Sequence, residues 1–342
     1  MTATDIRLII SDMRLDVRRP TTSVLLLLDF AAQRGITADT VLRDSGWSPT
    51  ALTAPGAEIS AGAELQCITN AVAALGNPQG LGLEMGVRYH LTSYGIWGFA
   101  LISAPTLRSA FETGLRYLDL TFSYLDMRIE SLGEEVHLVL DAAKVPAALQ
   151  RFMVERDAAA ITTIQSEIFA GALLPRRIEL AFPAPAEPAP YLRLFGLQPQ
   201  FASAQNRVIF DAAVLDRPLP QANPQAAQLC EAQCRQLLMQ RQARSGFAAQ
   251  VRDALLRNVG GRLPDLESVA ESLHLTSRTL RRRLDAEGTS FRALLDEVRQ
   301  TLAEELLGTT GMKVAEVASR LGYSEPASFL HARKRWRTAP RN

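Results

Sequence analysis

The chain has 342 residues, of which 47% are hydrophobic and 21% charged, which is the composition of a folded protein of about two domains. Its net charge of +1 argues against a histone-like or wholly acidic protein, and its three cysteines are too few for a disulfide framework. The longest apolar run ends before Asp29, far short of the roughly 18 residues that span a bilayer, and the first residues show no secretory signal. We therefore expect a cytoplasmic protein that makes no membrane contact.

The first part of the chain changes from helical to strand-like periodicity. Residues 24–34 and 60–76 carry apolar side chains at helical spacing, and residues 106–118 predict a further helix. Apolar and polar residues then alternate on both sides of Gly133, which predicts a β-hairpin. Helical spacing returns over residues 147–172.

Two more strands are predicted at residues 177–182 and 207–210, and the prolines from Pro183 to Pro190 indicate a loop between them. We therefore assign residues 1–220 to an α+β domain, with helices and a small, mostly antiparallel sheet.

Prolines at 218, 220 and 224 mark the end of the first domain. Residues 221–244 form a linker whose spacing predicts a helix from 226 to 241. Residues 245–342 contain no convincing strand pattern and predict an all-α domain.

The charge is distributed unevenly between these parts. Residues 245–342 hold 16 Lys and Arg against 12 Asp and Glu, a net charge of +4, whereas residues 1–244 hold 21 basic and 24 acidic residues, a net charge of −3. A small basic domain suits a polyanionic partner such as nucleic acid. A solvated helix face would give a similar pattern, so charge alone does not assign the function.

Two segments of the basic domain repeat at a distance of 48 residues. The matching pairs are Val269/Val317, Ala270/Ala318, Leu273/Leu321, His274/Gly322 and Thr276/Ser324. In each segment a small residue lies where two helices cross, a turn position favours positive φ, and a hydroxyl side chain is placed to cap the next helix. This pattern predicts two helix-turn-helix units.

The second helix of the first unit has Leu280 and Leu284 on its core side, whereas Phe329 is the core residue of the second unit's equivalent helix, about 325–336. The residues predicted to contact DNA are Thr276, Ser277, Arg278, Arg281 and Arg282 in the first unit, and Ser328, His331 and Lys334 in the second. Arginine can form two hydrogen bonds to guanine or clamp a phosphate. A long helix over residues 291–307 separates the units, so the two recognition helices could enter successive major grooves about 34 Å apart.

Residues 263–336 resemble the DNA-binding domain of AraC/XylS-type transcriptional regulators. The motifs that carry this resemblance are Leu280-Arg-Arg-Arg-Leu284, Glu287-Gly-Thr-Ser-Phe291, Leu321-Gly-Tyr-Ser-Glu-Pro326 and Lys334-Arg-Trp336. Residues 24–219 resemble the arabinose-binding-type effector domain of some members, which implies that the domain at residues 1–220 binds an effector and dimerises. The motifs there are Gly80-Leu-Gly-Leu-Glu-Met-Gly86, Tyr94-Gly-Ile-Trp-Gly98, Ser103-Ala-Pro-Thr106 and the segment from Phe210 to Pro218.

The chain departs from the family pattern near its end. Arg333 stands where the family has a phenylalanine, and a charge at a buried helix position would be costly. The family also continues past the position of Trp336 with a turn and a short helix that this sequence lacks. These departures predict a weakened second unit.

No sequence pattern for catalysis is visible: the chain lacks a phosphate loop, a nucleophile elbow and a His-Glu-x-x-His motif. We therefore expect neither an enzyme nor a cofactor. Cys230 and Cys234 are four residues apart and could hold a metal or sense oxidants, but no histidine is near them in sequence, which favours buried or idle thiols. Cys67 is expected in the core. The lone residues His90 and His137 are expected to be surface or core groups.

The glycines at 80, 82 and 86 do not have the spacing of a dinucleotide-binding motif, and we interpret them as turn and close-packing residues. Candidate effector-binding residues are the aromatic residues Trp97, Tyr117, Phe122 and Tyr124, together with Arg88 and Tyr89, which could orient an acid or an amine. Core packing is the alternative for each aromatic residue, and a solvated loop for Arg88 and Tyr89.

The leading hypothesis is a sequence-specific transcription regulator, controlled by a small-molecule effector. The resemblance implies promoter DNA and RNA polymerase as partners, a homodimer, and activation as the commoner mode of action. Two alternatives remain at this point: a cofactor- or metabolite-binding enzyme-like protein with a helical interaction tail, and a regulator impaired by its shortened C-terminus.

Overall fold

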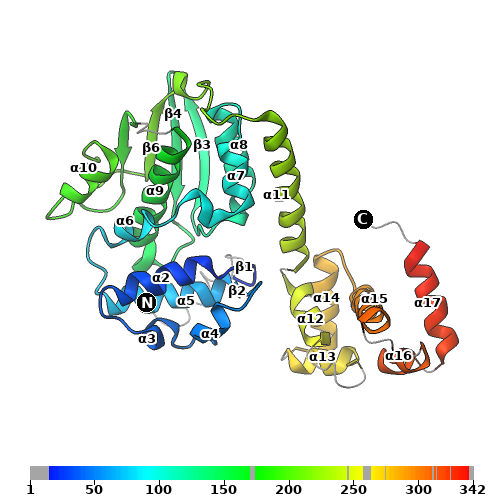
Figure 1. The fold of residues 1–342 in the computed structure, drawn as a ribbon. Helices are drawn as coiled ribbons and strands as arrows, with labels where there is room; N and C mark the ends of the chain where they lie inside the picture. The colour runs from blue at the N-terminus through cyan, green and yellow to red at the C-terminus, as the bar shows by residue number, and fades with distance from the viewer. Residues whose placement is uncertain are drawn as a thin grey trace. The chain divides into compact units, whose positions relative to one another are not determined.

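The computed structural model describes residues 15–169, 174–244, 246–256, 263–273, 275–309, 312, 314–323 and 325–338. The chain forms two compact units that divide after Arg241 (Figure 1). The described part of the first unit combines helices with two antiparallel sheets, and that of the second contains helices only. The predicted α+β domain followed by an all-α domain is therefore confirmed.

The first unit begins with a helical layer. Its elements are β1 (Arg18–Pro20), α2 (Thr22–Ala32), α3 (Ala38–Leu42), α4 (Pro49–Leu52), β2 (Glu58–Ser60) and α5 (Ala61–Ala74). Strand β1 pairs antiparallel with β2, and α5 packs against both α2 and α3. The predicted helices at 24–34 and 60–76 are thus confirmed, and Cys67 of α5 is buried in this layer.

Glycines allow α6 (Leu81–Gly86) to pack closely on the long helix α9 (Ala147–Phe169). Gly80 has φ +85° and precedes α6, and a Cβ on Gly82 or Gly86 would lie 2.3 or 2.2 Å from a backbone oxygen of α9. The Glu155 carboxylate of α9 accepts hydrogen bonds from the amides of Gly80 and Gly82, at 3.1 and 3.0 Å. These glycines are turn and packing residues, as predicted.

The larger sheet has four strands in the order β3-β4-β6-β5, all antiparallel to their neighbours. Their bounds are β3 (Asp126–Leu132), β4 (Glu135–Asp141), β5 (Arg177–Glu179) and β6 (Arg207–Asp211). The predicted hairpin turns at Gly133, which has φ +62°. Strand β5 ends earlier than predicted, at Glu179.

Helix α10 (Ala189–Phe195) was not predicted, and it begins within the segment interpreted as a proline-rich loop. Pro190 lies in its first turn, where its missing N–H group costs no hydrogen bond. The helix buries Tyr191 and Phe195 against the core.

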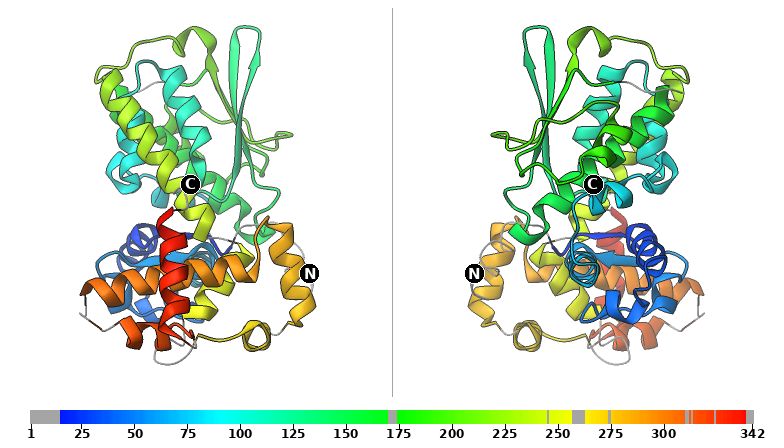
Figure 2. Two further views of the ribbon diagram at one scale, coloured as in Figure 1. Left: turned by 90° about the vertical axis from the view of Figure 1, so that its right-hand side faces the viewer. Right: turned by 90° about the vertical axis from the view of Figure 1, so that its left-hand side faces the viewer.

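The remaining elements of the first unit are short 3₁₀ helices, two further α-helices and the linker helix. They are the short 3₁₀ helices at Leu91–Tyr94, Leu118–Leu120 and Ala212–Val214, the helices α7 (Ile96–Ile102) and α8 (Leu107–Arg116), and the linker helix α11 (Pro224–Arg244). Figure 2 shows the large sheet on one side and α7, α8 and α11 on the other. The predicted helices at 106–118 and 226–241 correspond to α8 and α11.

The second unit is a bundle of short helices around one longer helix. Its elements are α12 (Phe247–Leu256), α13 (Leu266–Ser272), α14 (Ser277–Ala286), α15 (Phe291–Thr309), α16 (Val314–Arg320) and α17 (Pro326–Thr338). Helix α15 contacts both α12 and α16. No helix in the described parts of either unit is long and apolar enough to cross a bilayer.

Candidate DNA-binding and effector sites

Helices α13 and α14 form the first helix-turn-helix. Val269 and Ala270 of α13 and Leu280 and Leu284 of α14 are all buried in the core of the second unit. The hydroxyl of Thr276 accepts a hydrogen bond from the amide of Thr279 at 3.2 Å and so caps α14, as predicted. The position of His274 in the turn lies outside the described residues.

The opposite face of α14 carries exposed arginines. Arg278, Arg281 and Arg282 are exposed, and within the described residues none of the three guanidinium groups is held in an ion pair or a hydrogen bond. Arg283 differs because its guanidinium lies 5.4 Å from the centre of the Phe247 ring, toward α12. Three arginine side chains are therefore available on one surface of the first helix-turn-helix.

Helices α16 and α17 form the second helix-turn-helix. Val317, Ala318, Leu321 and Phe329 occupy its core, and Phe329 lies with its ring centre 5.7 Å from Tyr323 and 6.2 Å from Trp336. Gly322 has φ +81°, the conformation expected for the turn. Ser324, the predicted cap, lies outside the described residues.

The outer face of α17 is more mixed than that of α14. Ser328, His331 and Lys334 are all exposed, as predicted. Arg333 is only partly buried, whereas the neighbouring Ala332 faces the core. The expectation of a charge at a buried helix position is therefore wrong: the helix turns this side chain partly toward solvent, and α17 forms with Phe329 inside.

The long helix α15 is tied to both helix-turn-helix units. Arg252 of α12 forms an ion pair with Glu297 of α15 at 2.9 Å, and Glu287, just after α14, accepts hydrogen bonds from the first amides of α12. On the other side, Arg299 of α15 donates to the carbonyl of Leu321 at 3.0 Å and lies 4.7 Å from the Tyr323 ring centre. Helix α15 is therefore linked to the first helix-turn-helix through α12 and to the second directly.

A cavity of about 100 Å³ lies in the first unit. Its walls come from α7, α8 and α9 and from strands β3 and β4, and nearly all of its lining is apolar. Three of the six effector candidates line it: Tyr89, Trp97 and Phe122. Tyr94 joins these aromatic residues, with ring centres 5.0 Å from Trp97 and 5.5 Å from Phe122.

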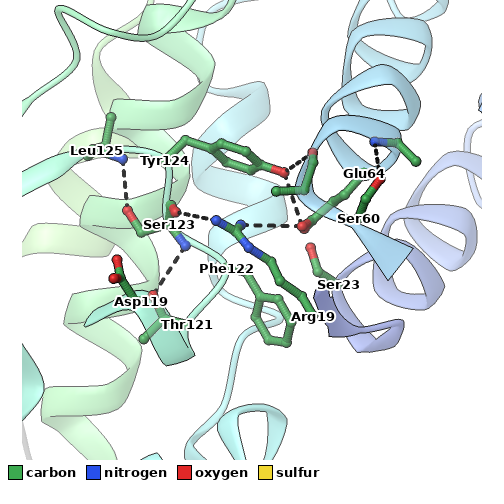
Figure 3. Close-up of polar contacts among 12 residues, drawn as sticks. Arg19, Ser23, Ser60, Glu64, Asp119, Thr121, Phe122, Ser123, Tyr124 and Leu125 are labelled. Carbon is green, nitrogen blue, oxygen red and sulfur yellow. Dashed lines mark hydrogen bonds and ion pairs between the residues drawn. The ribbon is translucent and has the colours of Figure 1, made fainter. Parts of the chain in front are cut away.

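The other three candidates lie outside the cavity lining, and each forms polar contacts there. Arg88 lies at the surface and binds Asp29 at 2.8 Å. The Tyr117 hydroxyl donates to Glu231 at 3.4 Å. The Tyr124 hydroxyl donates to Glu64, which also pairs with Arg19 (Figure 3). None of the three lines the cavity.

The polar residues of the cavity were not predicted from the sequence. Arg156 and Asp157 are adjacent on α9, both buried, and paired at 2.8 Å. Arg156 also donates to the Phe122 carbonyl at 3.0 Å, and Ser123 donates to Asp157 at 2.5 Å. Gln165 lies toward the C-terminal end of α9 and is also buried in the lining. The only sequence signal for these residues was their place in an otherwise apolar helical stretch.

The linker helix α11 docks on the cavity's outer wall within the first unit. Glu231 of α11 accepts from Arg116 of α8 at 2.6 Å, and Cys234 is fully buried in a core cluster that also contains the cavity residues Trp97 and Leu101. Burial raises the pKa of the Cys234 thiol to about 11, so the group is protonated near neutral pH. Cys234 is therefore a packing residue.

The histidines and cysteines do not gather into a metal site among the described residues. His90 pairs with Glu167 at 2.5 Å, whereas His137 is buried beside Glu135. Burial raises the pKa of the Cys67 thiol to about 11.

The chain is similar to known transcription regulators over nearly its whole length. The family model "Arabinose-binding domain of AraC transcription regulator, N-term" matches residues 35–219, and a helix-turn-helix domain model matches residues 269–340. An uncharacterized HTH-type transcriptional regulator of Mycobacterium tuberculosis is 38% identical, with 94% of each chain covered. The ornithine utilization regulator of Pseudomonas aeruginosa is 31% identical, with 91% of each covered.

Among solved structures, the transcriptional regulator CdpR from Pseudomonas aeruginosa is 26% identical and aligns with a TM-score of 0.49, over 92% of this chain and 95% of the other. The domains and relatives together are those of a transcription regulator, not of an enzyme.

Proposed function

Because this chain belongs to the AraC family of DNA-binding transcription regulators with an arabinose-binding-type N-terminal domain, we propose that α14 and α17 read promoter DNA under the control of an effector in the first unit. The observation that carries the proposal is the outer face of α14. Arg278, Arg281 and Arg282 are exposed there, while Leu280 and Leu284 anchor the same helix in the core. Exposed guanidinium groups on a recognition helix suit guanine edges and phosphates.

We assign the DNA contacts of the first helix-turn-helix to Thr276, Ser277 and the three arginines. Those of the second helix-turn-helix are assigned to Ser328, His331 and Lys334. Helix α15 contacts α12 through the ion pair of Glu297 with Arg252, and the second helix-turn-helix through the hydrogen bond of Arg299 to Leu321. We propose that both recognition helices face the same side of the duplex and enter successive major grooves.

We place the effector in the cavity walled by α7, α8, α9 and the large sheet. A ligand changes an equilibrium only through unequal affinity for two states. The cluster that contains Trp97 and Leu101 of the cavity wall also contains Cys234 of α11. A ligand that moves this wall therefore changes how the linker helix docks, and with it the placement of the DNA-reading unit.

The wider assignment follows the family. We propose a cytoplasmic homodimer that activates transcription by contacting RNA polymerase beside the promoter. A reporter gene placed behind the operator would test this mode: deletion of the regulator lowers expression of an activated gene and raises that of a repressed one.

The DNA assignment is tested by replacing arginines on one helix. Arg278→Ala and Arg282→Ala should each weaken operator binding by about 1–3 kcal/mol at fixed salt, because each removes a guanidinium group that we propose contacts a base. Arg283→Ala is the matched control, since this arginine of α14 packs over Phe247. Gel shifts with labelled operator give the affinities. Equal affinity for wild type, Arg278→Ala and Arg282→Ala would refute the assignment.

A further inference from the structure

The cavity of the first unit contains two buried donor groups that nothing in the described structure satisfies. They are Nη1 of Arg156 and Nε2 of Gln165. The two residues are only 2% and 6% exposed. Both residues line the cavity. A buried donor without a partner costs about 1–3 kcal/mol, so an acceptor that reaches either group would bind favourably.

The cavity follows α9 over several turns. Its lining on this helix runs from Arg156 through Ala160 and Ile164 to Ile168, and a helix rises about 1.5 Å per residue, so this wall is about 18 Å long. A volume of about 100 Å³ spread along such a wall makes the cavity narrow. The space therefore suits a slender chain better than a sugar or a fused ring system.

The charge balance around Arg156 selects the kind of acceptor. Asp157 already neutralises Arg156 at 2.8 Å, and the nearby buried Arg19 is likewise paired with Glu64. A carboxylate ligand would add an uncompensated negative charge beside Asp157 in an apolar space, which is costly. A neutral carbonyl accepts the free hydrogen bond of Arg156 without this cost.

We propose that the effector is a slender, mainly apolar molecule with a neutral carbonyl group, which accepts a hydrogen bond from Nη1 of Arg156 beside Phe122 and Tyr89. This inference rests on the proposed effector role of the cavity. Ketones, esters, lactones and amides share the required chemistry. The apolar chain extends along Ile164 toward Gln165, whose free amide would meet a second acceptor in a longer ligand.

Three probes of matched shape test the proposal on the full chain by calorimetric titration at pH 8. They are 2-nonanone, 2-methyl-1-nonene, in which a methylene group replaces the carbonyl oxygen, and nonanoate, which is ionised. We expect 2-nonanone to bind about tenfold more tightly than the alkene, as for one hydrogen bond to a charged donor. We also expect it to bind more tightly than nonanoate. Equal binding of ketone and alkene, tighter binding of nonanoate, or no binding of any probe would overturn the proposal.

A pair of identical substitutions on α9 assigns the donor. Arg156→Lys keeps the positive charge beside Asp157 but removes the guanidinium fork, so the preference for ketone over alkene should fall to about twofold or less. Arg151→Lys is the control, because Arg151 lies on the same helix outside the cavity lining and should keep the full preference. An unchanged preference in Arg156→Lys would contradict the assignment. Operator binding without any probe is measured separately, so failure here leaves the DNA-reading proposal standing.

Discussion

The two helix-turn-helix units share a core and differ on their outer faces. Val269 and Ala270 in the first unit and Val317 and Ala318 in the second are all buried. By contrast, α14 presents three exposed arginines, while α17 presents Ser328, His331 and Lys334. The shared core specifies one fold twice, whereas the surface decides what each copy recognises. We therefore expect the first helix-turn-helix to supply most of the charge-assisted contacts to DNA.

The largest expected effect comes from breaking the second core. Phe329→Ala removes a fully buried ring packed against Tyr323 and Trp336, and should lower the free energy of unfolding of the second unit by about 3–5 kcal/mol. Urea unfolding followed by circular dichroism measures this loss. Leu330→Ala, at an exposed neighbouring position, should cost far less. Similar losses in the two variants would show that α17 is not packed as described.

The outer faces of α14 and α17 should differ in how DNA affinity depends on salt concentration and on base sequence. Lys334→Ala should weaken binding about evenly across sequences and reduce the salt slope by about one, because a lysine acts chiefly on phosphates. Arg282→Ala should instead relax the preference for one base pair and cost about 1–3 kcal/mol on the operator. Titrations at several salt concentrations, on operator and on single-base variants, separate the two effects. If both substitutions gave the same pattern, the distinction between the faces would fail.

A smaller effect is expected at the cap of α14. Thr276→Ala removes the acceptor for the Thr279 amide and should lower the stability of the second unit by about 1 kcal/mol. Thr276→Ser keeps the hydroxyl and should recover most of this loss in thermal unfolding. Failure of serine to recover stability would mean that the methyl group, not the cap, is what matters.

The smallest effect concerns acid stability of the first helix-turn-helix. The hydrogen bond from the Ser268 amide lowers the pKa of Asp265, the cap of α13. Because the folded pKa is below the unfolded one, the stabilisation is present above the unfolded value near 4 and disappears as pH falls through the folded value. Asp265→Asn should therefore flatten the loss of stability between about pH 5 and pH 3. An unchanged pH dependence of urea midpoints would contradict this role.

Local patterns predicted the DNA-reading unit well. The apolar spacing placed Leu280, Leu284 and Phe329 in the core, and the hydroxyl of Thr276 marked the start of α14. These features depend on residues close in sequence, which periodicity and capping rules describe. Arg333 was misjudged because whether a helix position is fully buried depends on which neighbouring elements cover it.

The cavity of the first compact unit, where we propose that the effector binds, was predicted less well because it is assembled from distant segments. Tyr89, Trp97 and Phe122 meet there, but Tyr117 and Tyr124 belong to the same aromatic stretch and point to other partners. In the sequence, the buried pair Arg156–Asp157 could not be distinguished from exposed polar residues of a helix. Only the packing of α9 under the sheet and against α7 and α8 turns it into part of a cavity.

The central claim is that two linked helix-turn-helix surfaces read a specific duplex. Hydroxyl-radical footprinting of the full chain on DNA upstream of its own and neighbouring genes tests it directly. We predict two protected patches on one face of the duplex, about one helical turn apart, that survive an excess of random competitor DNA and fade in Arg278→Ala. Protection that disappears with random competitor for every upstream fragment, with and without the carbonyl probe, would contradict the claim.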